Sequence, residues 1–152
     1  MCSAFLRVHV SYPSLSEEER LEIADTVKTL IAWLKEHQLE ENDFIRQSLI
    51  EGLESFLFRI QKLDWLGWGY ALESLQSVIM AYVALERGGV DQNIQPNTAA
   101  VLKRVGSGLK KCFELIGVSK DVYEKADFAL KAYGTLMLTY QGAESVHGLI
   151  SN

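Results

Sequence analysis

The sequence predicts an all-α, single-domain bundle of about five helices that covers residues 1–152. Proline occurs only at Pro13 and Pro96, so no proline interrupts a helix over residues 14–95. Apolar residues recur at steps of three and four, which is the spacing of one face of a helix. Hydrophobic residues make up 48% and charged residues 23% of the 152 residues, which is close to the globular average and enough for one core.

The N-terminal segment is expected to differ from the rest. Over residues 5–12 apolar and polar side chains alternate, so that Leu6, Val8 and Val10 share one side of an extended chain. This pattern predicts a short strand, and we treat residues 1–13 as an extended arm.

Boundary residues predict where the helices begin and end. Ser16 and Glu19 have the spacing of a capping box, in which each side chain bonds the backbone N–H of the other residue. Asn42 is an expected N-cap, and Pro96 suits the first turn of a helix. Gly67 is an expected reversal or hinge because glycine enters left-handed conformations at little cost. The expected helices span 16–38, 43–66, 70–87, 97–116 and 120–141.

Glycines also mark the later helices. The third helix is apolar on nearly all sides, so it is expected at the centre of the bundle and is expected to end at Gly88 and Gly89. Gly106 and Gly108 weaken the fourth helix by about 1 kcal/mol each relative to Ala, so they predict close approach of a neighbouring helix. The tail, 143–152, is expected to fray or to add one turn. The expected core positions are Ile23, Val27, Leu30, Ile31, Leu34, Ile45, Leu49, Leu53, Phe56, Ile60, Leu63, Leu102, Val105, Leu109, Cys112 and Ile116. The fifth helix has a further stripe of Val122, Ala126, Ala129, Tyr133, Leu136 and Tyr140.

The charge is unevenly distributed. The net charge is −5, and residues 1–76 hold 13 acids against 7 bases, whereas residues 77–152 hold 7 acids against 8 bases. This balance argues against a domain that mainly binds the backbone of a nucleic acid. It favours instead the orientation of a protein partner or of a second copy of the chain.

The cysteines and the apolar runs predict the compartment. Cys2 and Cys112 are the only cysteines and are not expected to form a structural disulfide. No secretion signal is recognised at the start, so a reducing cytoplasm is predicted. The longest apolar run, residues 78–85, is far shorter than the roughly 20 residues that span a bilayer, so no membrane helix is expected.

No catalytic or metal-binding motif is found. The sequence has no nucleophile elbow, Walker loop or dinucleotide fingerprint. His9, His37 and His147 lie on separate segments, and Glu144 forms with His147 a single Glu-x-x-His step where a di-iron site needs two. We therefore expect no enzymatic activity and predict no metal or cofactor. Three acids lie near apolar stripes and are interpreted as solvated edge positions, with partial burial as the alternative: Asp64, Glu73 and Asp127.

Two surface features are candidates for binding. Trp65, Trp68 and Tyr70 lie within six residues, and they predict either a rigid anchor for a partner or rings that fill a helix corner. A basic ridge on the fourth helix predicts a site for a phosphate or an acidic protein face, such as the first helix of another subunit, or an ordinary solvated face. The residues of this basic ridge are Lys103, Arg104, Lys110 and Lys111.

The extended arm needs a hydrogen-bonding partner, because a lone strand has unpaired backbone groups along both edges. The candidates are the same strand of a second copy, an edge strand of another protein, or a helix surface with water on the open side. We favour the first, which predicts a homodimer.

Together these features predict a non-enzymatic protein-interaction module of the inhibitor, immunity or adaptor type. The partner-binding candidates are Trp65, Trp68 and Tyr70 with the arm residues Leu6, Val8 and Val10. An alternative is a bundle that binds a small apolar ligand or cofactor, and a weaker one is nucleic-acid binding through the basic ridge. The ligand alternative depends on a lining made of Tyr82, Phe113, Tyr133, Met137 and Tyr140.

Overall fold

The computed structural model confirms the all-α fold. It describes residues 15–40, 42–90, 95–118 and 128–136, and it assigns no strand among them. The predicted strand over residues 5–12, the start of the fifth helix and the tail lie outside the described residues.

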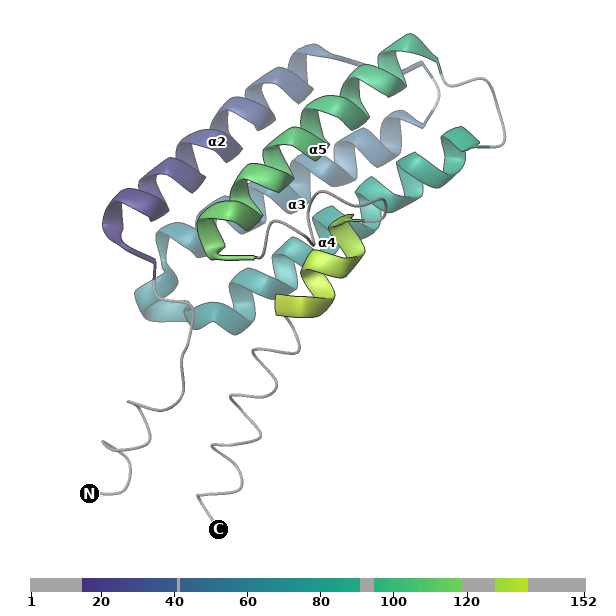
Figure 1. Cartoon of the computed structure of the whole chain (residues 1–152). Helices are drawn as coiled ribbons and strands as arrows, with labels where there is room; N and C mark the ends of the chain where they lie inside the picture. The colour runs from purple at the N-terminus through teal and green to yellow at the C-terminus, as the bar shows by residue number, and fades with distance from the viewer. Residues whose placement is uncertain (1–14, 41, 91–94, 119–127, 137–152) are drawn as a thin grey trace, which may run out of the picture.

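Four long helices run side by side, and each turns back on the one before it (Figure 1). They are α2 (Glu17–Glu36), α3 (Asp43–Gln61), α4 (Leu63–Val90) and α5 (Pro96–Ile116). Helix α2 packs against α3 and α5, and α4 packs against the same two helices. The four therefore form an up-down-up-down bundle whose core lies between them. Residues 128–136 are also helical.

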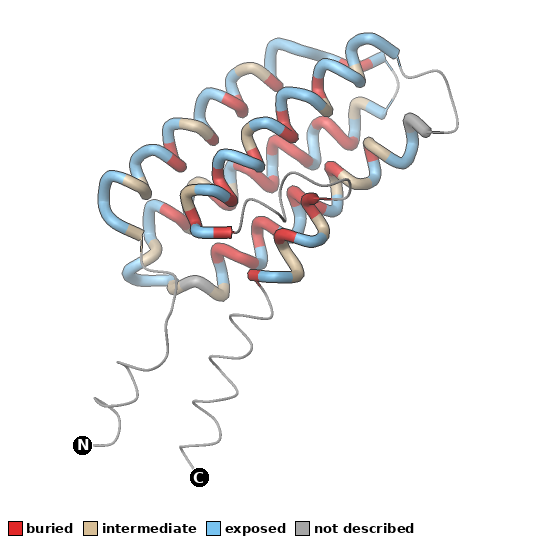
Figure 2. The backbone as a smooth tube through the Cα atoms, viewed as in Figure 1, coloured by how far each residue is buried: buried red, intermediate tan, exposed pale blue. Residues whose placement is uncertain are grey.

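Helix α4 is not the centre of this bundle, so the sequence prediction for it is wrong. Figure 2 shows buried positions along the side of α4 that faces the other helices and exposed positions along its opposite side. The exposed residues of α4 include Glu73, Ser77 and Met80. The apolar residues of α4 also pack against a further helical segment. Tyr82 on this helix also contacts Phe128, so α4 packs against the 128–136 segment as well as against α3 and α5.

The predicted boundaries are confirmed at three helix ends. The Ser16 hydroxyl accepts from the Glu19 N–H, and the Glu19 carboxylate accepts from the Ser16 N–H, each at 3.1 Å. Pro96 begins α5, and Gly117 ends it in a left-handed conformation with φ of 98°. The prediction that Gly88 ends the third helix is wrong, because α4 continues through Gly88 to Val90. Gly88 does not adopt the left-handed conformation that terminates a helix.

Close packing at the glycines is confirmed. A Cβ at Gly106 would lie 2.9 Å from the Tyr82 hydroxyl, and one at Gly108 would lie 3.0 Å from Leu30 Cδ2. The sequence reading missed a third such position. At Gly52, a Cβ would lie 2.9 Å from Cγ2 of Val78, so α3 and α4 approach closely there.

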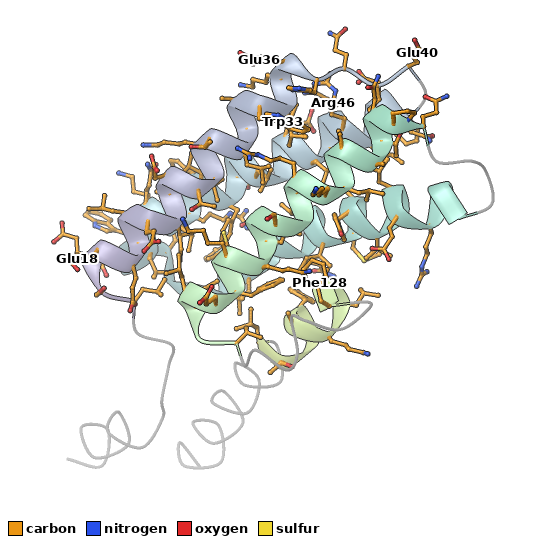
Figure 3. All side chains as sticks on the ribbon, turned by 45° about the horizontal axis from the view of Figure 1, so that its top comes forward. Glu18, Trp33, Glu36, Glu40, Arg46 and Phe128 are labelled. Atoms are coloured by element: carbon orange, nitrogen blue, oxygen red, sulfur yellow. The ribbon has the colours of Figure 1, made fainter. Side chains whose placement is uncertain are left out.

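The core follows the predicted stripes of α2, α3 and α5. Nearly every predicted position is buried, although Leu63 and Leu102 are only half-buried at its edge. Acidic side chains of the first half, such as Glu18, Glu36 and Glu40, lie on the outer surface (Figure 3). Buried positions that the prediction missed include Leu39, Val101, Phe113, Val118, Phe128 and Ala132.

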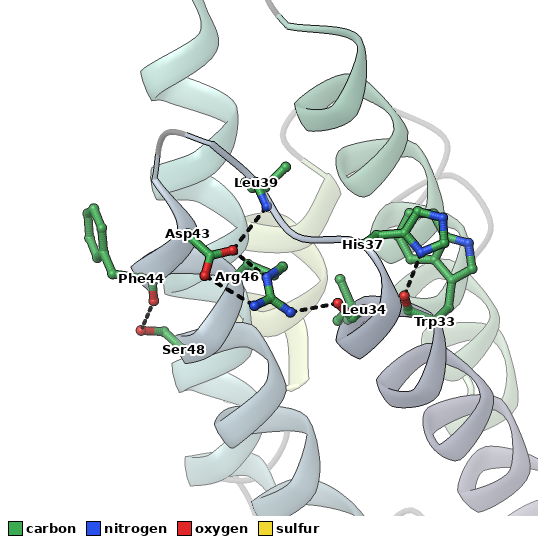
Figure 4. A network of polar contacts seen from close by, with 8 residues as sticks. All are labelled: Trp33, Leu34, His37, Leu39, Asp43, Phe44, Arg46 and Ser48. Atoms are coloured by element: carbon green, nitrogen blue, oxygen red, sulfur yellow. Dashed lines mark hydrogen bonds and ion pairs between the residues drawn. The ribbon is translucent and has the colours of Figure 1, made fainter.

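A buried arginine holds the loop between α2 and α3 (Figure 4). Arg46 is 5% exposed, and its Nη1 donates to the Leu34 carbonyl oxygen at 2.7 Å. Its Nε and Nη2 donate to the two carboxylate oxygens of Asp43. The Leu39 N–H donates to the same carboxylate at 3.0 Å. These hydrogen bonds from Arg46 and Leu39 lower the pKa of Asp43 from 3.8 to about 2.

Asn42 is the N-cap residue of α3, as the sequence predicted, but its side chain does not cap the helix. Its backbone is left-handed, with φ of 61°, and its side chain makes no capping hydrogen bond. Asparagine tolerates this conformation better than most residues. The residue therefore serves the turn geometry, and Asp43 supplies the polar contacts of the loop.

Candidate protein-binding surface

The chain reverses between α3 and α4 at a sharp corner. The helix predicted over 43–66 instead ends at Gln61, with Lys62 as its C-cap. The backbone N–H groups of Trp65 and Leu66 then donate to the Lys62 carbonyl oxygen at 2.9 Å, which starts a new turn. Gly67, with φ of 79° and ψ of 172°, places a kink after that turn, as the sequence predicted.

An arginine of α3 ties this corner to the straight part of α4. Arg59 Nη1 donates to the Tyr70 carbonyl oxygen at 2.6 Å and lies 3.5 Å from the Glu73 carboxylate. The same guanidinium lies over the Tyr70 ring, 5.6 Å from its centroid. Arg59 therefore fixes the position of Tyr70 relative to α3.

A second arginine ties the corner to α2. Arg20 Nη1 donates to the Asp64 carboxylate at 3.0 Å, across 44 residues of sequence. Asp64 is largely exposed, so this pair contributes little to stability by itself. The pair brings the residue before Trp65 beside the first turn of α2.

The corner presents apolar side chains to solvent. Trp65 is 90% exposed, Tyr70 is 55% exposed and Leu66 is 36% exposed. We call these three residues the aromatic corner. The alternative that the rings fill a helix corner is therefore wrong for Trp65, and the side chain of Trp68 lies outside the described ones.

A groove adjoins the aromatic corner. It encloses about 560 Å³ between the first three turns of α2 and the chain from Ile60 to Asp64. Its floor contains the buried Ala24 and Ile60, and Leu21 stands at its edge with 64% of its surface exposed. We call this space the α2 groove. Its other lining residues are Glu17, Arg20, Asp25, Lys28 and Gln61.

The basic ridge is exposed but does not act as one patch of free cations. Lys111 Nζ lies 3.4 Å from the Glu22 carboxylate, so the acidic first helix of the same chain pairs with it. Arg104 lies 6.0 Å from the centroid of the Trp33 ring, and Lys110 lies 4.8 Å from that of Phe128. Lys103 alone of the four is without such a contact among the described residues. One charge of the ridge is therefore paired within the chain, whereas the ring contacts leave Arg104 and Lys110 charged.

The acids predicted at apolar edges are solvated where they are described. Asp64 and Glu73 are both exposed and lie against Arg20 and Arg59. Asp127 lies outside the described residues, as do the arm candidates Leu6, Val8 and Val10.

Of the remaining polar candidates, His37 and Cys112 lie among the described residues. His37 is exposed, stacks on Trp33 at 3.9 Å, and its Nδ1 lies 2.7 Å from the Trp33 carbonyl oxygen. No group of three or more metal-ligating side chains occurs within the described ranges. Burial raises the pKa of the Cys112 thiol to about 12, so this group is a poor nucleophile in the folded chain. His9, His147 and Glu144 are not among the described residues.

Two described residues of the predicted ligand lining contact the same ring. Tyr82 and Phe113 each pack edge-on against Phe128, with centroids 5.8 Å and 6.3 Å apart. Burial also raises the pKa of Tyr82 and of Tyr133. Met137 and Tyr140 are outside the described residues.

Comparison with protein-family models, with curated proteins and with solved structures finds no match to this chain. Among the described helices, none is both long enough and apolar enough to cross a bilayer.

The sequence reading missed the groups that position the aromatic corner. Arg20 and Arg59 carry no motif, and their partners lie 44 and 11 residues away. The only signal in the sequence was that Trp65 and Tyr70 lie close to Gly67. This indicated a corner but did not show which rings would face solvent.

Proposed function

We propose that the protein is a non-enzymatic interaction module that binds another protein through the aromatic corner. The observation that carries this proposal is the exposure of Trp65, which is 90%. An exposed tryptophan leaves a large apolar surface in water, and tryptophan is enriched among the residues that dominate protein interfaces.

The backbone around Trp65 supports this role. Arg59 bonds the Tyr70 backbone on one side of Trp65, and the exposed Arg20–Asp64 pair lies on the other. A partner therefore meets a preformed backbone, and association costs less conformational entropy than it would at a mobile loop. An inhibitor, immunity protein or adaptor acts by such a surface and needs no catalytic group.

The test uses a photo-crosslinking amino acid at position 65 of the full chain, expressed in its native source. Position 80 is the matched control, because Met80 is 56% exposed on the outer face of α4. We expect position 65 to crosslink to one protein that position 80 does not reach. The same crosslinks from both positions would contradict the proposal.

The second step measures affinity for the purified crosslinked protein. Trp65→Ala is expected to weaken binding about 30-fold or more, which corresponds to about 2 kcal/mol for a dominant interface residue. Met80→Ala is expected to change the affinity less than about twofold, as residues outside an interface do. An unchanged Kd for Trp65→Ala would remove the aromatic corner from the interface.

A further inference from the structure

A second groove runs between α2 and α5, which pack side by side (Figure 1). It encloses about 270 Å³, and the buried Leu30 and the half-buried Gly108 line its base. This volume is below the roughly 300 Å³ at which pockets for drug-sized ligands begin, so the space suits a smaller ligand. We call it the α2–α5 groove. Its other lining residues are Asp25, Thr26, Thr29, Arg104, Ser107 and Lys111.

Two cations of the basic ridge line this groove from α5. Arg104 and Lys111 are seven residues apart, so they lie on the same side of the helix. Their positions are about 10 Å apart along the helix axis, at roughly 1.5 Å per residue. Lys103 and Lys110, the other members of the ridge, do not line the groove. A ligand beside Ser107 therefore meets positive charge on two sides.

Arg104 lies against a ring but has no oxygen acceptor. Its guanidinium is 6.0 Å from the centroid of the Trp33 ring, and no hydrogen bond or ion pair joins it to any other described residue. In contrast, Arg20, Arg46 and Arg59 each donate to an oxygen atom of the chain. A guanidinium presents its N–H groups in a planar fork that matches the oxygens of a phosphate. The fork of Arg104 is therefore available to an external anion.

Hydroxyl groups from both helices lie between the two cations. Thr29 of α2 and Ser107 of α5 line the groove, and neither side chain has a hydrogen-bond partner among the residues that the structure describes. The Thr26 hydroxyl differs, because it donates to the Glu22 carbonyl oxygen at 2.8 Å. Thr29 and Ser107 can each donate a hydrogen bond to an oxyanion. The groove thus offers donors from two directions.

We propose that the α2–α5 groove binds a phosphate group. Arg104 donates to its oxygens from α5 together with Ser107, and Thr29 donates from α2. A phosphate suits this arrangement better than a carboxylate does, because its oxygens point in tetrahedral directions and reach donors on both helices.

Lys111 completes the site by exchanging one anionic partner for another. Its Nζ lies 3.4 Å from the Glu22 carboxylate, and both side chains are half-exposed. Exposed pairs of this kind are weak, so a phosphate in the groove competes with Glu22 for the ammonium group. Two cations suit one phosphate group, whereas a nucleic acid backbone needs a longer row of them.

Asp25 is the only acid among the described lining residues, and it provides a test of opposite sign. It also lines the α2 groove, so it lies on the part of α2 that separates the two spaces. Its carboxylate repels a phosphate nearby. Asp25→Asn is therefore expected to tighten phosphate binding about two- to threefold, as removal of a solvated like charge does.

Titration of the full chain with inorganic phosphate, followed by nuclear magnetic resonance at constant ionic strength, tests the inference. We expect the backbone amide signals of Thr29, Ser107 and Gly108 to shift and to saturate. The expected Kd is on the order of 1 mM, because a few exposed charge-assisted hydrogen bonds provide the affinity. Acetate at the same ionic strength should not produce these shifts.

Arg104→Gln is expected to raise the Kd for phosphate about tenfold, because it removes the charge-assisted hydrogen bonds of the fork. Lys103→Gln is the matched control, since it removes the same charge from the adjacent position of α5, outside the groove. It should change the Kd by less than about twofold, as a screened surface charge does. All three substituted residues are exposed, and unchanged dispersion of the amide signals would show that the variants are folded.

Phosphoserine as a second probe identifies the source of the phosphate. A lower Kd for phosphoserine than for inorganic phosphate assigns the groove to a phosphate carried by a larger molecule. An equal or higher Kd assigns it to free phosphate.

Three results would overturn the inference. One is the absence of a saturable shift with either probe. Another is an equal loss of affinity in Arg104→Gln and Lys103→Gln, because the anion would then follow the charge of the whole ridge. The third is the same shifts with acetate as with phosphate.

The inference goes beyond the proposed function and does not depend on it. The α2–α5 groove shares no residue with the aromatic corner. A negative titration leaves the crosslinking test at Trp65 unaffected, and a failed crosslink leaves the groove unaffected.

Discussion

The guanidinium of Arg46 donates a hydrogen bond to the carbonyl oxygen of Leu34 over 2.7 Å. Leu34 lies in the last turn of α2, and its carbonyl oxygen also accepts from the backbone N–H of the C-cap residue His37 at 3.2 Å. Arg46 supplies a second donor from α3, and Asp43 balances its charge. One charged side chain thus joins the end of one helix to the start of the next.

Arg46→Met is expected to lower the free energy of unfolding by about 1–3 kcal/mol, because it removes one donor from the buried Leu34 carbonyl and the cationic partner of the Asp43 carboxylate. Urea denaturation followed by circular dichroism measures this loss. Arg87→Met, at an exposed position of α4, is the control and should change stability by less than about 0.5 kcal/mol. Equal effects of the two substitutions would show that the Arg46 contacts contribute nothing specific.

The Asp43 carboxylate predicts a loss of stability in acid. Its pKa is about 2 in the folded chain against an ordinary value of 3.8, so the unfolded chain binds the proton more readily. The stabilisation is complete well above pH 4 and is lost as the pH falls from about 4 to about 2. Denaturation of the wild type and of Asp43→Asn across this range should show a steeper decline for the wild type. Parallel curves would contradict the assignment.

Substitution of two helical glycines by alanine should change the stability in opposite directions, because Gly52 contacts Val78 and Gly88 has open space around it. Gly52→Ala places a Cβ 2.9 Å from the Val78 side chain and 3.2 Å from its backbone nitrogen, and backbone cannot move aside easily. We expect a loss of about 1–3 kcal/mol from overpacking. Gly88→Ala meets nothing within 4 Å in a helical position, so it should stabilise the protein by roughly 0.5–1 kcal/mol. Thermal unfolding of both variants checks the two signs.

Local signals explain why much of the fold was predictable. The stripe of α2 from Ile23 to Leu34 is buried as its spacing predicted, because a helix turns every 3.6 residues whatever it packs against. The capping box of Ser16 and Glu19 is also a contact within one turn. Such features are encoded over a few residues.

Contacts between distant residues explain the errors. The apolar circumference of α4 indicated a central helix, but packing against the 128–136 segment accounts for it equally well, and periodicity cannot distinguish the two. The break at Lys62 was missed because apolar spacing continues through Ile60 and Leu63. A helix end without a glycine or proline leaves little trace in such a pattern.

The candidate site was predictable in composition but not in geometry. The sequence indicated that Trp65 and Tyr70 lie at a corner. Whether a ring there faces the core or the solvent depends on the helix axis after Lys62 and on the anchoring of Asp64 by Arg20. Both features depend on tertiary contacts, which a local sequence pattern does not show.

Trp65 itself provides the last prediction, which separates a binding residue from a structural one. Because the side chain is 90% exposed, Trp65→Ala should change the free energy of unfolding by less than about 0.5 kcal/mol. Phe56→Ala removes a ring that is 1% exposed and should cost about 3–5 kcal/mol. Chemical denaturation of both variants makes the comparison. A loss of several kcal/mol for Trp65→Ala would mean that the ring packs within the folded chain, and the aromatic corner would then lose its main argument as a protein-binding surface.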